Sequence, residues 1–202
     1  MKAELLGAIP QGALIVGQST WANRPAASAY NGKGWYMTNL KHVFISDGTD
    51  WFPLGGSARG GGSNVAATVT GTTNRTSVWS ETIPADLLGL NGQIWIYPQI
   101  TVTNNANAKN PRIKLGSTDF WQPTGVSITS TSGLYIIANR NNKAVQVGTP
   151  GTSAAITGTS GAASAVAGTE NTANALTLDF SFQLANASDS ATLERIYWEL
   201  RK

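Results

Sequence analysis

Apolar and polar residues alternate with a period of two along much of this chain, most clearly over Leu176–Leu184. In this segment, LTLDFSFQL, Leu or Phe fills every second position and Thr, Asp, Ser or Gln fills the positions between. Successive side chains of a strand point to opposite faces of a sheet. The pattern therefore predicts an antiparallel strand with one buried face, formed by Leu176, Leu178, Phe180, Phe182 and Leu184.

Shorter runs rich in β-branched and aromatic residues recur along the chain, separated by Gly, Pro and Asn. They cover residues 65–70, 77–83, 94–103, 112–115, 126–130 and 134–139. Pro98 interrupts one of them, and because proline has no N–H to donate, it predicts a sheet edge or a bulge there. About eight strands within one domain of about 140 residues predict a β-sandwich, with the jelly roll as the leading topology.

Three segments fit this pattern less clearly. Residues 84–90 have the composition of a single helical turn. Residues 191–200 suit a helix by propensity, but Thr, Ile, Tyr and Trp at alternating positions favour a strand with Thr192, Glu194, Ile196, Trp198 and Leu200 on one face. Residues 148–174 consist almost only of Gly, Thr, Ser, Ala and Asn, so they either contain a strand near residues 154–157 or form a projecting loop.

The N-terminal quarter of the chain has a different composition. Residues 21–54 are dense in aromatic side chains and contain two strong hairpin signals, Asn31-Gly32 and Asp47-Gly48. Strands at 35–37 and 42–46 would form a small β-meander around an aromatic core. The predicted fold class is therefore all-β, with a small N-terminal β-meander and a C-terminal jelly-roll-like β-sandwich over residues 64–202.

Two further segments flank the meander. Residues 1–20 form an apolar tail with little patterning, which could add a strand to the sheet edge of a partner. Its candidate docking residues are Leu5, Leu6, Ile9, Leu14, Ile15 and Val16. Residues 55–63 read GGSARGGGS, with five glycines among nine residues, and predict a flexible hinge.

Composition and charge exclude several classes of function. Charged residues are 12% of the 202 residues and the net charge is +3, with the basic residues scattered rather than clustered, so we expect no nucleic-acid binding. The chain has no cysteine, no run of about 20 apolar residues and no signal peptide, so we expect no disulfide, no membrane insertion and no export. We expect no cofactor and no metal, because a zinc site needs three or four ligands and the chain has one histidine.

Candidate catalytic residues are few. His42 lies in a predicted strand, where a structural role is expected, and no nucleophile motif accompanies it. Glycan hydrolysis needs only two carboxylates, for which Asp47, Asp50 and Asp119 are candidates, although the first two suit a turn. Trp121, next to Gln122-Pro123, is the tryptophan best placed for exposure, and with Asp119 it is the candidate glycan contact.

Several motifs resemble those of bacteriophage fibre, head-fibre and decoration proteins. WANRPAA at 21–27, WYM at 35–37, SDGTDW at 46–51 and PLGG at 53–56 are similar to a short module near the N-termini of such proteins. TIPADLLGLNG at 82–92, TNNANAKN at 103–110, RIKLG at 112–116, IANRNN at 137–142 and ATLE at 191–194 are similar to a jelly-roll-like domain on the tail or capsid surface. The resemblance does not extend over residues 148–174. It implies no catalytic residues, and it implies a homotrimer.

The function expected from this resemblance is structural and non-enzymatic. The chain would be a surface protein of the virion, made in the host cytoplasm, acting as a tail fibre or receptor-binding protein or as a head fibre or decoration protein. The N-terminal region would attach it to other virion proteins of the capsid or tail, and host surface glycan is a further candidate partner. The alternative is a tail spike enzyme that degrades host polysaccharide.

Overall fold

The computed structural model describes residues 15–123, 131–149 and 165–202. In these residues the secondary structure is β-strand, apart from single 3-10 turns at Trp21–Asn23 and Ala27–Ala29. The chain forms two compact units, Met1–Gly60 with Glu199–Lys202, and Gly61–Trp198. The predicted all-β fold class is confirmed.

The N-terminal unit contains one four-stranded sheet with the order β1-β2-β3-β4. Its strands are β1 (Ile15–Ser19), β2 (Gly34–Met37), β3 (His42–Ser46) and β4 (Trp51–Pro53). Strands β2, β3 and β4 form the predicted antiparallel meander, and β1 pairs in parallel with β2. Gly32 and Gly48 have φ of 72° and 90°, so the predicted turns do use the positive φ that glycine tolerates.

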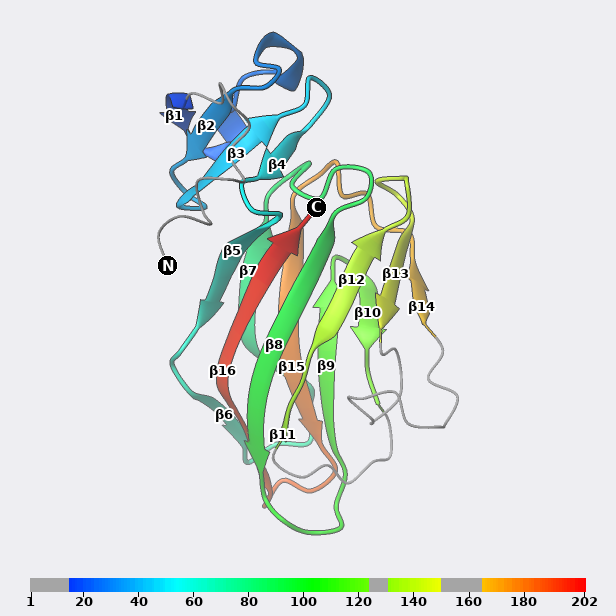
Figure 1. Cartoon of the computed structure of the whole chain (residues 1–202). Coiled ribbons are helices and arrows are strands. Elements are labelled where there is room, and N and C mark those ends of the chain that lie inside the picture. Colours follow the sequence, from blue (N-terminus) through cyan, green and yellow to red (C-terminus); the bar gives the residue numbers. More distant parts are fainter. Residues whose placement is uncertain (1–14, 124–130, 150–164) are drawn as a thin grey trace. The chain divides into compact units, whose positions relative to one another are not determined.

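The second unit is a sandwich of two antiparallel sheets, seen as two layers in Figure 1. One sheet has the order β10-β9-β15-β7; the other has the order β14-β13-β12-β8-β16-β5, with β11 beside β8 and β6 beside β16. The strands are β5 (Ser57–Ser63), β6 (Ala67–Thr70), β7 (Thr76–Ile83), β8 (Gln93–Val102), β9 (Lys109–Leu115), β10 (Thr118–Trp121), β11 (Thr131–Ser132), β12 (Tyr135–Asn139), β13 (Gln146–Thr149), β14 (Val166–Gly168), β15 (Leu176–Leu184) and β16 (Ser190–Arg201).

The strand order is that of a jelly roll. Numbering β5/β6, β7, β8, β9, β10, β11/β12, β15 and β16 from one to eight gives one sheet in the order 1-8-3-6 and the other in the order 2-7-4-5. Strands β13 and β14 extend the first sheet beyond this frame, and β14 lies within the segment 148–174 whose structure the sequence left open. Residues 126–130 and 154–157, where further strands were predicted, lie outside the described residues.

The core lies between the two sheets and follows the alternation seen in the sequence. In β15, Leu178, Phe180, Phe182 and Leu184 are all buried, and Leu176 at the strand start is half-buried. Strand β16 confirms the strand interpretation of residues 191–200 but corrects its faces. Before Glu194 the buried residue is Leu193, and Thr192 faces outward; from Ile196 onward the even-numbered positions are buried. The alternation therefore shifts by one residue at Glu194-Arg195, as it does at a β-bulge.

The glycine-rich segment predicted as a hinge is strand β5, which pairs with β16. The reason is close packing rather than flexibility. A Cβ atom on Gly61 would collide with the Glu81 carboxylate, and one on Gly62, whose φ is 135°, would collide with the Ile196 carbonyl oxygen. The glycines therefore allow close backbone approach.

Pro98 does not lie on an edge strand, because β8 has neighbours on both sides. The adjacent ladder changes there from β12, paired with residues 93–96, to β11, paired with residues 99 and 100. Pro98 thus lies between the two ladders, where no neighbouring strand needs a backbone N–H from it. Residues 84–90 form turns rather than a helical turn.

Candidate functional site

The predicted docking residues lie partly in β1. Leu5, Leu6, Ile9 and Leu14 lie outside the described residues. Ile15 and Val16 belong to β1 and are 55% and 40% exposed. Because β1 pairs only with β2 among the described strands, its other edge carries backbone groups that a partner strand could pair with.

Residues 15–19 also hold the N-terminal unit together, which the interpretation of 1–20 as a single tail did not foresee. Trp35 Nε1 donates a hydrogen bond to Ser19 Oγ at 2.9 Å. The Trp35 ring lies where a Cβ atom of Gly17 would be, so only glycine fits beneath it. Strand β1 is therefore part of the meander's packing as well as an exposed edge.

The predicted glycan contact at Trp121 and Asp119 is not an exposed aromatic surface. Trp121 is 3% exposed, and its ring packs against Tyr135 and Phe180 at centroid distances of 4.3 Å and 6.4 Å. A ring buried in this way cannot stack on a sugar. The Asp119 carboxylate pairs with Arg112 at 3.5 Å, and Arg112 also pairs with Asp179 at 3.4 Å.

Asp47 shapes a turn in the N-terminal unit. Its Oδ1 accepts hydrogen bonds from the backbone N–H of Thr49 and of Asp50, both at 2.8 Å. Burial alone would raise the pKa of Asp47, but these hydrogen bonds favour the carboxylate, and the net pKa is lowered. His42 Nε2 donates to the Leu54 carbonyl oxygen at 2.9 Å, so it too has a structural partner.

Asp50 binds the last residue of the chain. Lys202 Nζ donates to Asp50 Oδ2 and to the Trp51 carbonyl oxygen, each at 2.9 Å, and the Lys202 side chain is 2% exposed. The ammonium also lies 5.5 Å from the Trp21 ring centroid and 5.6 Å from that of Phe52. The end of β16 thereby becomes part of the aromatic core of the N-terminal unit.

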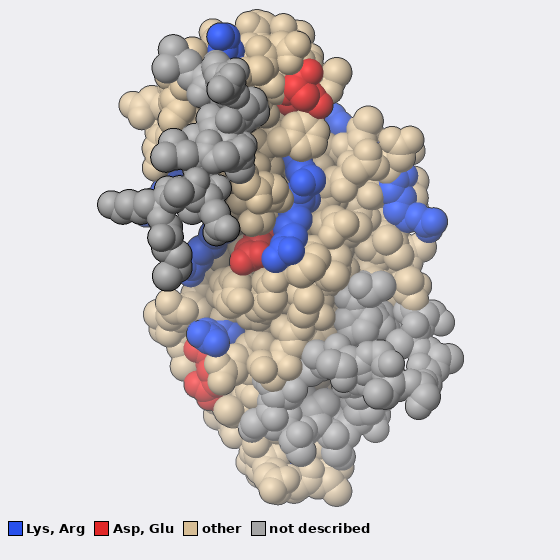
Figure 2. All heavy atoms as spheres, viewed as in Figure 1, with Lys and Arg blue, Asp and Glu red and all other residues tan. Residues whose placement is uncertain are grey.

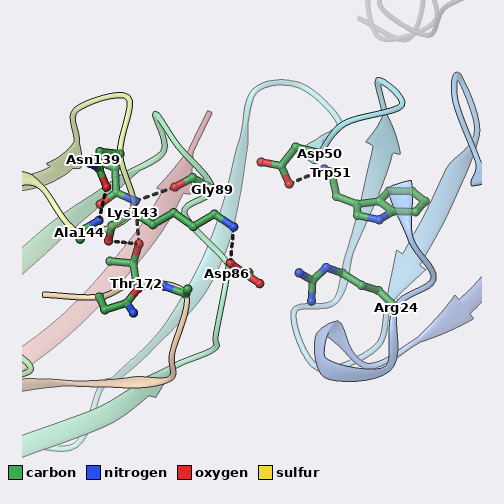
Figure 3. Close-up of polar contacts among 12 residues, drawn as sticks. Arg24, Asp50, Trp51, Asp86, Gly89, Asn139, Lys143, Ala144 and Thr172 are labelled. Atoms are coloured by element: carbon green, nitrogen blue, oxygen red, sulfur yellow. Dashed lines mark hydrogen bonds and ion pairs between the residues drawn. The ribbon is translucent and has the colours of Figure 1, made fainter. Parts of the chain in front are cut away.

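A cluster of polar residues at one end of the sandwich was not predicted, and we call it the Asn139 cluster. It consists of Asp86, Gly89, Asn139, Lys143 and Thr172, which Figure 3 labels, together with Gln146. Asn139 Nδ2 donates to the Gly89 carbonyl oxygen at 2.7 Å and to Thr172 Oγ1 at 2.8 Å. Asn139 Oδ1 accepts from Gln146 Nε2 at 3.0 Å. One buried amide thus joins two loops and the start of strand β13.

The rest of the cluster completes these contacts. Lys143 Nζ pairs with Asp86 Oδ1 at 2.6 Å, and Asp86 adopts a φ of 60°, which is uncommon for a residue other than glycine. The Lys143 carbonyl oxygen accepts hydrogen bonds from Thr172 Oγ1 and from Gln146 Nε2, both at 3.0 Å. Each buried polar side chain therefore has partners, as a stable polar cluster requires.

The Asn139 cluster joins two of the motifs that carry the phage resemblance. Asp86 and Gly89 belong to TIPADLLGLNG, and Asn139 belongs to IANRNN. The same two motifs meet again where the backbone N–H of Asn141 donates to Asn91 Oδ1 at 2.9 Å. Loop packing therefore accounts for Asp86, Gly89, Asn91 and Asn139 of these motifs.

The motif TNNANAKN has a structural explanation of the same kind. Lys109 is fully buried, pairs with Asp189 at 3.6 Å and donates a hydrogen bond to Asn105 Oδ1. Asn105 Nδ2 donates to Asp189 Oδ1 at 2.7 Å, and this hydrogen bond is the main cause of a lowered Asp189 pKa.

The solvent face of the larger sheet contains a shallow groove of about 290 Å³. Tyr97, Pro98, Gln99, Ser132, Gly133, Arg195 and Tyr197 line it. The rings of Tyr97 and Tyr197 stack with a centroid distance of 4.5 Å and an interplanar angle of 13°. Sequence reasoning missed this groove because its residues lie on strands that are distant in sequence.

The described residues show little sign of other binding chemistry. On the face drawn in Figure 2, charged side chains are few, and blue ones adjoin red ones at several places, so no large patch of one sign forms. Within residues 15–123, 131–149 and 165–202, no group of three or more His, Asp or Glu residues is arranged to hold a metal, and no helix has the length and hydropathy to cross a membrane. Comparisons with protein-family models, with curated proteins and with solved structures each find no match to this chain.

Proposed function

We propose that this chain is a structural protein of a bacteriophage particle, displayed on the particle surface. It serves either as a tail fibre or receptor-binding protein, or as a head fibre or decoration protein. The observation that carries the proposal is the joining of two phage-like motifs through buried Asn139 at one end of a jelly roll. The residues that make the sequence phage-like are also those that order the loops of this fold.

The partners of the candidate catalytic residues support a structural role. Asp47 accepts hydrogen bonds within its turn, Asp50 binds Lys202, and Asp119 pairs with Arg112. Each carboxylate therefore makes a hydrogen bond or ion pair that stabilises the fold. A glycan-degrading spike is the competing function, and turnover of host polysaccharide that stops on Asn replacement of one of these three residues would establish it instead.

Attachment through the N-terminal region is supported by the exposed edge of β1. Ile15 and Val16 are apolar, exposed and located on an edge strand, which is the combination that strand addition uses. The attachment partner is another virion protein of the capsid or tail. The low share of charged residues suits a homotrimer, since few charges have to be desolvated when copies associate.

The proposal is tested by quantitative mass spectrometry of purified particles of the phage that encodes the chain. We expect the chain at a fixed copy number that survives washing in high salt, in a multiple of three. Absence from washed particles, with abundant free protein in the lysate, would refute a structural role.

A further inference from the structure

The groove on the larger sheet is formed by outward-facing side chains of β8 and β16. In β8, Tyr97 lies between the buried residues Ile96 and Pro98; in β16, Tyr197 lies between the buried residues Ile196 and Trp198. Both tyrosines therefore belong to the solvent side of the sheet, where their stacked rings form one wall of the groove. Stacked aromatic side chains on a solvent face offer apolar surface next to polar hydroxyl groups.

The polar residues of the groove supply hydrogen-bond donors and one positive charge. Arg195 is exposed and makes no ion pair or side-chain hydrogen bond with the described part of the chain. Gln99, on the neighbouring strand, is exposed and likewise keeps its amide available to a ligand. Among the described residues that line the groove, none is Asp or Glu, and the one charged side chain is the Arg195 cation.

We propose that this groove binds an anionic saccharide, a sugar that carries a carboxylate group. The Arg195 guanidinium would bind the carboxylate through paired N–H donors. The Gln99 amide and the Tyr197 hydroxyl would bind sugar hydroxyl groups, and the tyrosine rings would contact the apolar face of the sugar. This inference names a ligand class for the proposed surface protein and rests on that function for its biological setting.

The groove's size and openness fit a short glycan segment. Its volume of about 290 Å³ is at the small end of ligand pockets, which span roughly 300–1,000 Å³. One or two sugar rings fill such a space, and an open groove leaves the ends of a longer polysaccharide free. Ser132, with a small side chain, and Gly133, with none, also line the groove and leave room in it.

The first experiment measures binding of the full chain to two carboxylated trisaccharides, trigalacturonate and α2,8-linked trisialic acid, and to neutral galactotriose. Isothermal titration calorimetry at low salt is suitable, because exposed charge pairs weaken as salt screens them. We expect at least one carboxylated sugar to bind and galactotriose to bind at least tenfold more weakly. Failure of both carboxylated sugars, or equal binding of the neutral one, would overturn the proposal.

Substitutions then locate the site. Arg195→Gln should weaken binding at least tenfold, since one charge-assisted contact is lost, and Tyr197→Ala should weaken it by a similar factor. Arg140→Gln is the matched control, because Arg140 is also exposed and makes no side-chain hydrogen bond or ion pair with a described residue. Undiminished binding by the Arg195→Gln protein would place the sugar elsewhere and refute the groove assignment. Loss of sugar binding leaves incorporation into particles unchanged, so this result and the test of the proposed function remain separable.

Discussion

Replacing Asn139 by alanine should destabilise the jelly roll more than any single contact of the cluster suggests. The side chain is 5% exposed and makes three hydrogen bonds, to the Gly89 carbonyl oxygen, to Thr172 Oγ1 and from Gln146 Nε2. Each hydrogen bond lost at these buried groups costs about 1 kcal/mol. The sum is about 3 kcal/mol, which for a domain of this size lowers the melting temperature by roughly 10 °C.

Urea unfolding of the full chain, followed by tryptophan fluorescence and circular dichroism, measures this loss. Asn104→Ala is the matched control, since Asn104 is exposed and its side chain makes no hydrogen bond with a described residue. Hydrogen exchange should also show faster opening of residues 86–92 in the Asn139→Ala protein, because the Gly89 contact is gone. A loss within about 0.5 kcal/mol of the control would show that the Asn139 cluster does not stabilise the fold.

Three further predictions concern other parts of the chain. Lys202→Met should destabilise the N-terminal unit by about 2 kcal/mol in thermal unfolding, because it removes a buried ammonium with two hydrogen bonds and two aromatic contacts. Lys33→Met, at an exposed site, is the control, and equal unfolding midpoints for the two variants would refute the effect. Glu170→Gln should be less stable than the wild type near neutral pH, and the difference should disappear as pH falls below the ordinary glutamate pKa of 4.5. Burial raises the Glu170 pKa, but hydrogen bonds from Ser117 and Thr118 lower it by more, so the net pKa in the folded protein is lowered. The carboxylate therefore stabilises the fold above the ordinary pKa, and this stabilisation is lost as pH falls through the lowered one. A stability difference between the two proteins that stays constant from about pH 7 to about pH 3 would contradict this. Deleting residues 1–20 should abolish incorporation into particles and also destabilise the N-terminal unit, because β1 and the Ser19 contact are removed; normal copy number after this deletion would place attachment elsewhere.

Local periodicity was enough to predict much of the fold. The bounds of Leu176–Leu184 and of His42–Ser46 are those expected, because alternation and flanking turn residues are properties of neighbouring positions. The jelly roll followed from the number and spacing of such strands. The shift of alternation within β16 could not be predicted, because it depends on how β16 pairs with its neighbouring strands and not on the sequence of β16 alone.

Features that depend on residues distant in the sequence could not be predicted from the sequence. Trp121, beside Gln122-Pro123, was the tryptophan best placed for exposure, but Tyr135 and Phe180 bury it. Asn139 finds its partners 50 and 33 positions away, so no local motif marks the cluster. Gly61 and Gly62 of β5 are explained by Glu81 and by β16, whereas composition alone suggested a hinge.

The central claim is tested most directly by cryo-electron microscopy of the phage that encodes this chain, comparing wild-type particles with particles that lack it. The account predicts surface density on the capsid or tail into which a jelly roll fits, and which is missing from the deletion particles. Identical density in both particles would contradict the assignment of this chain to the virion surface.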